Sequence, residues 1–153
     1  MDPEILASAL ALNNDHKVET GELTSDALLL LFRTAFHSQI EGAGRDGLLL
    51  CFDQSAAYTS PNFMWFKARR DRYVYIDRVI VAPHARGRGL ARSFYNGLIA
   101  HAKGAGHQSI VCEVNLDPPN PGSLAFHAAM GFVGLEDVVL SNGKTVRYME
   151  LRI

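Results

Sequence analysis

The chain has 153 residues and a formal net charge of −1, and hydrophobic residues make up 48% of it. This length fits one domain, residues 1–153, and the composition is ordinary for a soluble globular protein. The near-neutral charge gives no electrostatic basis for binding nucleic acid. The longest apolar run, ALLLLF at 27–32, is too short to cross a bilayer. We therefore expect neither a nucleic acid nor a membrane as a partner.

Both cysteines, Cys51 and Cys112, lie inside apolar runs that resemble strands. Neither belongs to a CxxC pair, so buried free thiols are favoured over a disulfide or a metal site. The N-terminus, MDPEILASAL, opens with an acidic residue and lacks the basic start of a secretion signal. We therefore expect a reducing compartment, the cytoplasm.

The first half of the chain gives mixed signals for secondary structure. Residues 4–12 (EILASALAL) are apolar and fit either a strand or a short helix. Thr24 or Ser25 can cap a helix that runs to about Phe36. The continuous apolar run at 48–52 is typical of a strand buried on both faces. The long stretch that follows is predicted to be irregular, apart from a helical turn at FMWF.

The second half is predicted to alternate strands and helices: strand 73–82, helix 89–103, strand 109–115, helix 120–130 and strands 133–140 and 145–152. The first three make a βαβ unit, so their two strands should be parallel neighbours. Asn142-Gly143 is a strong hairpin signal between the last two strands. The fold class is therefore mixed α/β with an antiparallel C-terminal hairpin.

An Arg-Gly loop, HARGRGLAR at 84–92, connects the strand of the βαβ unit to its helix. A helix N-terminus carries unpaired N–H groups and partial positive charge. Gly87 and Gly89 let an anion approach the main chain, and Arg86, Arg88 and Arg92 add formal charge. The loop therefore has the parts of a phosphate cradle. It has neither the spacing of a Walker loop nor a complete GxGxxG.

Two motifs resemble signatures of the GNAT superfamily of acyl-CoA-dependent N-acetyltransferases. Residues 86–91 (RGRGLA) resemble its R/Q-x-x-G-x-G/A signature, and the preceding VIVAP is similar to the family's fourth strand. The stretch from Asn120 to Phe132 resembles the second signature, an Asn-led helix that ends in Gly-Phe. The resemblance is strong over 73–153 and looser before it. It implies a single-domain fold with a splayed mixed sheet flanked by helices.

The resemblance implies acetyl-CoA as the cofactor. Its pyrophosphate would lie on the N–H groups of Gly87 through Arg92, and its pantetheine arm would run beside Val79 and Val81. A main-chain N–H near Val79 would face the thioester oxygen and stabilise the oxyanion. The cofactor-binding residues implied are Val79, Ile80, Val81, Arg86, Gly87, Arg88, Gly89, Leu90, Ala91, Arg92, Asn120, Ser123, Phe126 and His127.

His127 occupies the position where many family members carry the tyrosine that protonates the CoA thiolate. Branches that resemble phosphinothricin-type acetyltransferases carry histidine here. An imidazolium can donate a proton to the sulfur, and a neutral imidazole can hydrogen-bond it. The alternative is a histidine that only lines the CoA tunnel.

The base that deprotonates the amine has three candidates: Asp77, Glu113 and Tyr75. Strand alternation would put Tyr73, Tyr75, Asp77, Val79 and Val81 on one face. Arg78 would point to the other face, which makes an ion pair with Asp77 awkward. A structural hydrogen bond for each candidate, or a water relay without a dedicated base, remains open.

The leading function is acetyl transfer to the amine of a small-molecule or amino-acid-like acceptor. A CoA-binding module or sensor with little or no transferase activity is the alternative. RNA binding through ARGRG is weakly supported because no aromatic ladder accompanies it. The aromatic stretch at 58–66 could contact a cationic amine or pack on the core. The C-terminal hairpin offers an edge at which a homodimer could form.

Overall fold

The computed structural model describes residues 1–153 and contains one six-stranded sheet. The strands are β1 (His37–Glu41), β2 (Gly47–Asp53), β3 (Val74–Val81), β4 (Ser109–Asp117), β5 (Val133–Val139) and β6 (Thr145–Arg152). The helices are α1 (Pro3–Asp15), α2 (Lys17–Thr20), α3 (Ser25–Thr34), α4 (Pro61–Lys67), α5 (Leu90–Gly104) and α6 (Pro121–Met130), with 3₁₀ turns η1 (Gly42–Gly44) and η2 (Pro83–Ala85). The strand order is β1-β2-β3-β4-β6-β5, and no helix is long and apolar enough to cross a membrane.

The apolar run at 4–12 is helical because the residues before it form a helix start. The Asp2 carboxylate accepts hydrogen bonds from the N–H groups of Glu4 and Ile5, and Pro3 occupies the first helical position. Thr24 caps α3 as predicted. That helix ends at Thr34, two residues before the predicted end, because Ala35 takes an extended conformation with ψ of 134°. The sequence HSQIE has one strongly apolar residue, so its pattern did not predict β1.

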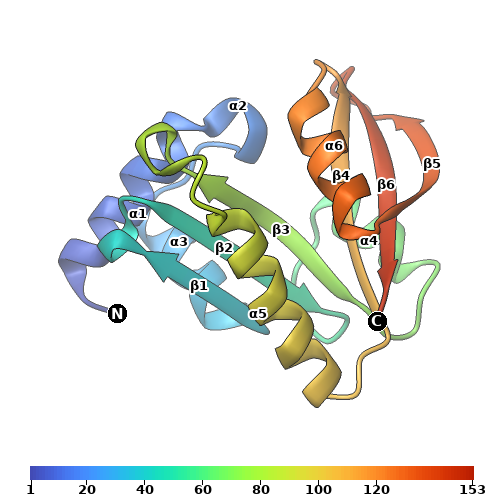
Figure 1. Cartoon of the computed structure of the whole chain (residues 1–153), viewed down its shortest axis with the longest axis horizontal. Coiled ribbons are helices and arrows are strands. Elements are labelled where there is room, and N and C mark those ends of the chain that lie inside the picture. Colours follow the sequence, from blue (N-terminus) through green and yellow to red (C-terminus); the bar gives the residue numbers. More distant parts are fainter.

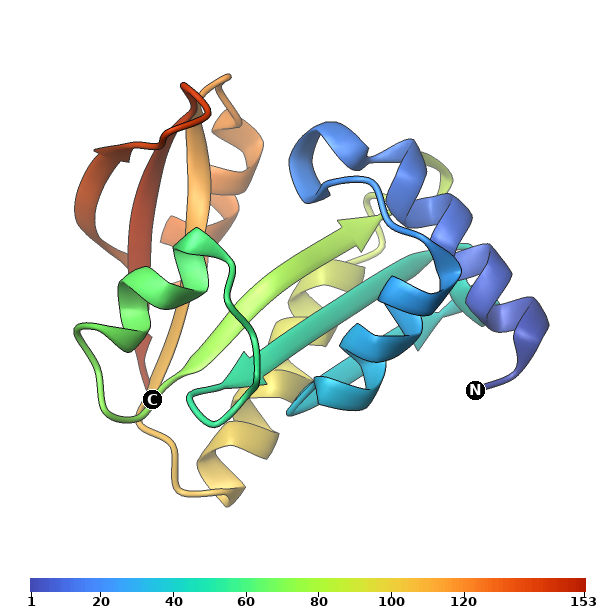
Figure 2. The ribbon, with the colours of Figure 1, turned by 180° about the vertical axis from the view of Figure 1, so that it is seen from behind.

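Helices cover both faces of the sheet (Figures 1 and 2). On one face, Phe94, Leu98 and Ala102 of α5 pack in the same buried cluster as Val74 of β3. On the other face, α1 and α3 cover the first strands, and α4 covers the last ones. Six of the seven residues of β2 are buried, as its continuous apolar run predicted. Cys51 and Cys112 are both buried and free, which confirms the prediction for the thiols.

A β-bulge interrupts β3 at Asp77. Leu50 pairs with Arg78, and the next residue, Cys51, pairs with Ile76, so Asp77 has no partner opposite it. The extra residue reverses the alternation of faces after Ile76. The prediction that Tyr75 and Val79 share one face was therefore wrong: Tyr75 packs in the cluster around α4, and Val79 packs against the cluster around α5.

The sheet opens between β3 and β4. These strands are parallel, as the βαβ unit predicted, but they pair only at Val74–Ile110 and Tyr75–Val111. Beyond these pairs the two strands diverge, and the sheet divides into two lobes (Figure 1). The second lobe contains the predicted C-terminal hairpin, in which Gly143 takes a positive φ of 85° in the turn. The divergence creates the space in which the functional site lies.

Candidate active site

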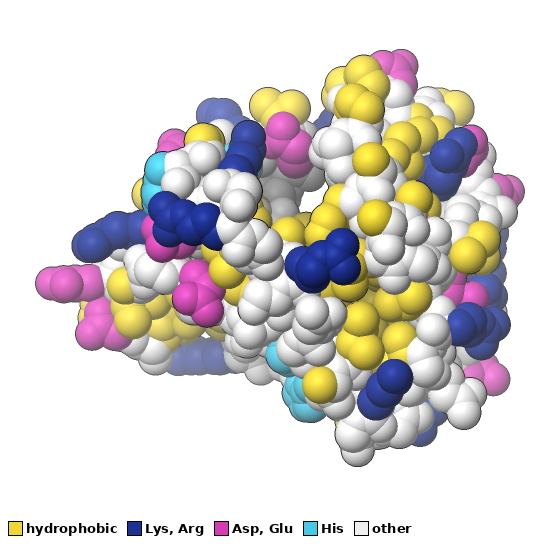
Figure 3. Space-filling view, in the orientation of Figure 1, with side chains coloured by type: hydrophobic (Ala, Val, Ile, Leu, Met, Phe, Trp, Pro, Cys, Tyr) yellow, Lys and Arg dark blue, Asp and Glu magenta, His cyan; other side chains and the backbone are white.

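A groove of about 620 Å³ runs along the gap between the lobes. Figure 3 shows the corresponding hollow at the top of the molecule. β3, the strand of the first lobe that borders the gap, contributes Val79, Ile80 and Val81, and α6 contributes the opposite wall. The other lining residues are His16 with Glu19 and Thr20 of α2, Arg86 in the loop before α5, Ala91 of α5, the α6 cap Asn120, and Gly122, Ser123, Phe126 and His127 of α6.

At its outer end, the groove meets the N-terminus of α5. Gly87 and Gly89 have φ values of 79° and 75°, which only glycine adopts without strain, and no heavy atom lies near the position of a Cβ on either. No side chain caps α5, so the N–H groups of Leu90, Ala91 and Arg92 have no partner within the helix. Main-chain donors and the positive end of the helix dipole are therefore free to bind an anion.

The three arginines of the loop differ in direction. Arg86 and Arg92 line the hollow beside the glycines. Arg88 lies outside this hollow and donates to the carbonyl of His84, next to Asp46 and Glu41. Every other residue predicted to bind the cofactor lines the groove or the hollow at its outer end.

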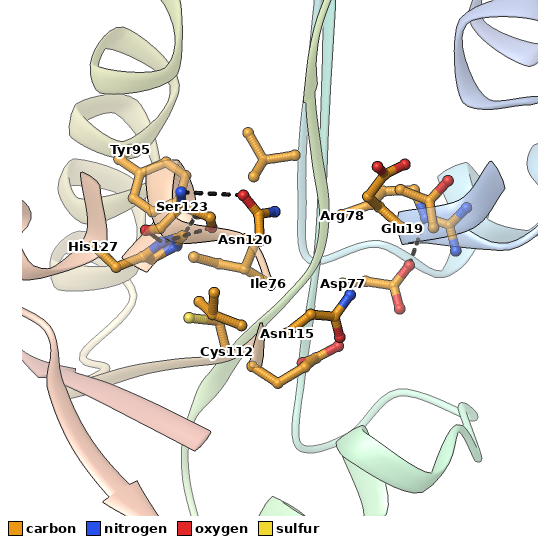
Figure 4. Close-up of a pocket in the computed structure, with 14 residues that line it drawn as sticks. Glu19, Ile76, Asp77, Arg78, Tyr95, Cys112, Asn115, Asn120, Ser123 and His127 are labelled. Carbon is orange, nitrogen blue, oxygen red and sulfur yellow. Dashed lines mark hydrogen bonds and ion pairs between the residues drawn. The ribbon is translucent and has the colours of Figure 1, made fainter. Parts of the chain in front are cut away.

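The inner end of the gap is a chamber between α6 and the bulge of β3 (Figure 4). On the α6 wall, His127 Nδ1 lies 2.7 Å from the carbonyl oxygen of Ser123, which can only accept. Nδ1 therefore carries the proton, and Nε2 accepts from the hydroxyl of Tyr95 at 2.7 Å. Burial lowers the pKa of His127, partly opposed by the Ser123 hydrogen bond. The imidazole is neutral, and both ring nitrogens have a partner.

Glu113 of β4 supplies a carboxyl group to the same chamber. The Tyr75 hydroxyl donates to it at 2.8 Å, and the Asn62 amide donates at 3.0 Å. Burial raises the pKa of Glu113 to about 8, against the lowering effect of the Tyr75 hydrogen bond, and the nearby charge of Asp77 adds to the increase. This group therefore exchanges a proton near neutral pH.

Tyr75 holds Glu113 in place and does not itself line the chamber. Burial and the charge of Glu113 raise the pKa of Tyr75 well above its ordinary value. The whole residue is 1% exposed. A phenol with this pKa stays protonated, so Tyr75 has no basic form with which to take a proton.

Asp77 lines the chamber, but both oxygens of its carboxylate already have a partner. Its carboxylate lies 2.7 Å from Arg78 Nε and accepts a short hydrogen bond from the Tyr58 hydroxyl. The expectation that Arg78 would be awkwardly placed for this pair was wrong, because the bulge turns both side chains to the same side of the sheet. Arg78 also donates to Asn13 in α1 at 2.7 Å, so Asp77 anchors the bulge to the N-terminal helix.

Five residues around the chamber had no specific role assigned from the sequence: Asn13, Glu19, Tyr58, Asn62 and Tyr95, of which Tyr58 and Asn62 belong to the stretch at 58–66 that was expected either to contact an amine or to pack on the core. Four of them lie far in sequence from the motifs, and only the tertiary fold brings them to the site. For Tyr95 a signal existed, because it follows Phe94 within α5 and a tyrosine hydroxyl on a buried helix face needs a partner.

The aromatic stretch at 58–66 packs mainly on the core. Phe63 and Phe66 are fully buried. Trp65 stacks on Tyr148 at 4.1 Å between ring centroids, and the guanidinium of Arg69 lies 3.9 Å from its ring centroid. These neighbours cover the indole of Trp65, so little of its surface is free to contact a substrate.

The splayed sheet, the groove and the uncapped helix start at its outer end are features of the fold class of the acyl-CoA-dependent acyltransferases. The family model described as Acetyltransferase (GNAT) family matches residues 47–132, more than half of the chain. The chain therefore belongs to the GNAT family of acetyltransferases.

Known relatives agree with this assignment. A phosphinothricin N-acetyltransferase of Alcaligenes faecalis is 35% identical over 91 residues, which are 60% of this chain and 42% of that protein. The chain thus matches less than half the length of this curated relative. In fold, it is similar to yncA of Salmonella typhimurium, solved with its cofactor acetyl-CoA (TM-score 0.71, 19% identity, 99% of this chain and 90% of that one). It is also similar to Naa20 of Chaetomium thermophilum, solved with a bisubstrate analogue (TM-score 0.73, 18% identity, 100% and 84%).

Proposed function

We propose that the protein transfers the acetyl group of acetyl-CoA to the amine of a small-molecule or amino-acid-like acceptor. One observation carries this proposal: the gap between β3 and β4 joins an anion-binding helix start to a buried carboxyl group with a pKa of about 8. The phosphates of an acyl-CoA need a site that binds anions, and the amine needs a group that accepts its proton. The reaction requires both sites at opposite ends of one passage. Membership of the GNAT family supports the same reaction.

The cofactor would occupy the groove from its outer end. Arg86 and Arg92 supply charge for the phosphates, and the free N–H groups at the start of α5 supply donors. The unpaired edge of β3 beyond Tyr75 can receive the pantetheine arm as an added strand. A main-chain N–H near Val79 would then face the thioester oxygen.

Glu113 is the group we assign as general base. The ammonium of the acceptor must lose a proton before its nitrogen attacks the thioester carbon. A carboxylate with a pKa of about 8 takes that proton far more readily than an ordinary one. Asp77 is committed to Arg78 and Tyr58, so we assign it the role of holding the wall of the chamber.

The thiolate that leaves when the carbon–sulfur bond breaks must gain a proton. We assign His127 to the sulfur end of the groove. Its neutral ring can hydrogen-bond the thiolate only after the hydrogen bond to Tyr95 or to Ser123 breaks. The nitrogen loses one proton to Glu113 before it attacks, which Glu113 then releases to solvent, and a second as the amide forms, which balances the proton that the thiolate gains. The net reaction therefore consumes no external acid.

Thiol release from acetyl-CoA tests the proposal, with a panel of primary amines assayed between pH 6 and 9.5. We expect turnover that needs both substrates and is lost in Glu113→Gln. The alternative function is a CoA-binding module. It is supported by the hydrogen bond between His127 and Tyr95, which occupies both side chains. Tight CoA binding without turnover on any amine would favour it.

We further propose that two copies pair along β5. This strand forms one edge of the sheet, and its exposed apolar side chains include Val133 at 65% and Val139 at 72%. Figure 3 shows hydrophobic side chains gathered on this lobe. Light scattering should give twice the chain mass, and Val139→Lys should restore the monomer. A wild-type protein that remains monomeric at high concentration would refute the pairing.

A further inference from the structure

The lining of the chamber contains more acidic than basic side chains. Figure 4 shows Glu19 and Asp77 on one side of β3, opposite His127. Together with Glu113 they make three acidic side chains in the lining, against a single basic one, Arg78. A ligand with a carboxylate beside its amine would need a cation in this wall, because burying an unpaired charge is costly.

Arg78 is not free to serve as that cation. Its Nε binds Asp77 at 2.7 Å, and its Nη1 donates to Asn13 at 2.7 Å. The side chain is 5% exposed. Turning toward a substrate would leave Asp77 buried without its ion pair and would remove the link to α1.

Cations outside the lining have other partners, and Lys17 of α2 lies 3.9 Å from the Glu22 carboxylate. Arg69 lies on Trp65, Arg70 binds Glu150 at 3.0 Å, and Lys144 donates to the carbonyl of Val18 at 2.9 Å. Arg86 lines the groove on the side that faces the phosphate end. The lining of the chamber therefore holds no free cation to pair with a carboxylate.

We propose that the acceptor is an amine without a carboxylate next to its reacting nitrogen, such as the product of decarboxylating an amino acid. This inference rests on the proposed acetyl transfer and narrows its acceptor. A cationic amine is attracted by Glu19 and by the ionised form of Glu113, whereas an α-carboxylate meets like charge and loses its hydration without compensation. The class of reaction that supplies such a substrate is decarboxylation.

Matched substrate pairs test the inference: tyrosine against tyramine, phenylalanine against phenethylamine, and histidine against histamine. The amide of each amino acid serves as a control, since it keeps the bulk but lacks the charge. Rates are compared across pH because the amines differ in their own ionisation. We expect kcat/KM to be at least about tenfold higher for the decarboxylated member, with the amide closer to the amine. Equal or higher kcat/KM for the amino acids would overturn the inference and leave acetyl transfer intact.

A charge reversal at the rim gives a second test. Glu19 is exposed on α2 and lines the chamber, so Glu19→Lys adds a cation without disturbing the core. It should shift the ratio of kcat/KM toward the amino acid by about fivefold or more. Asp71→Lys makes the same charge change at an exposed residue outside the lining and should leave the ratio unchanged. No turnover on any amine, with CoA still bound, would instead refute acetyl transfer and this inference with it.

Discussion

The Tyr95 hydroxyl lies 2.7 Å from Nε2 of His127 and connects α5 to α6 on the cofactor wall of the chamber. Both groups are almost fully buried, and burial raises the pKa of Tyr95 while it lowers that of His127. A neutral phenol and a neutral imidazole are thus the stable pair. This wall of the chamber therefore holds two polar groups that are hydrogen-bonded to each other and carry no net charge.

His127→Ala should lower kcat by about tenfold or more and raise KM for acetyl-CoA by less than about threefold. It should also lower the free energy of unfolding by about 2–4 kcal/mol, because it leaves a cavity and an unpaired buried hydroxyl. Tyr95→Phe is the matched control, since it removes the hydroxyl and keeps the ring. An unchanged kcat in His127→Ala would exclude His127 from the chemistry.

Glu113→Gln should reduce kcat/KM by about 10²- to 10⁴-fold. In the wild type, kcat/KM should rise with pH as Glu113 loses its proton, with a midpoint near its pKa of about 8, and this rise should disappear in the variant. Asp77→Asn provides the comparison. If the ionisation survives in Glu113→Gln and disappears in Asp77→Asn, the base has been misassigned.

Glu113 should also make the stability of the fold depend on pH. Its pKa in the folded state is raised to about 8, so the native state binds the proton more tightly than the unfolded chain does. The stabilisation is complete below the unfolded pKa of about 4.3 and disappears as the pH rises through about 8. Denaturant titrations at pH 5.5 and 9 should therefore show a smaller loss of stability in Glu113→Gln than in the wild type. Equal losses would contradict the raised pKa.

Arg78→Met should destabilise the fold by about 3–5 kcal/mol, because it leaves the Asp77 carboxylate buried without its ion pair. Adding Asp77→Asn should recover much of that loss, since an uncharged amide costs less to bury. Urea unfolding of the two single variants and the double variant gives the coupling energy. Additive losses would mean that the pair contributes nothing at the bulge.

Arg86→Ala should raise KM for acetyl-CoA by about fivefold and leave kcat nearly unchanged, because it removes charge at the phosphate end only. The effect should weaken at high salt. Arg88→Ala is the matched control, because Arg88 lies outside the hollow and binds the His84 carbonyl. Equal effects of the two substitutions would argue for general attraction rather than a built cradle.

The fold class and the loop before α5 could be predicted from the sequence because their signals are local. The glycines at 87 and 89 and the helix after them predicted the cradle, because positive φ values and free N–H groups follow from residue type and position. The Asn-led helix and the Asn142-Gly143 hairpin were equally local signals. Together they led to the family and to the fold class, and the family match confirms the assignment.

Only the tertiary structure decided the roles around the chamber. One unpaired residue in β3 changes which side chains face each other, and strand alternation cannot reveal such a bulge. The contacts that hold Glu113 come from Asn62, 51 positions away, and from Tyr75, 38 positions away. A carboxyl group acquires a pKa of about 8 from burial and neighbouring charge, and both are properties of packing rather than of the local sequence.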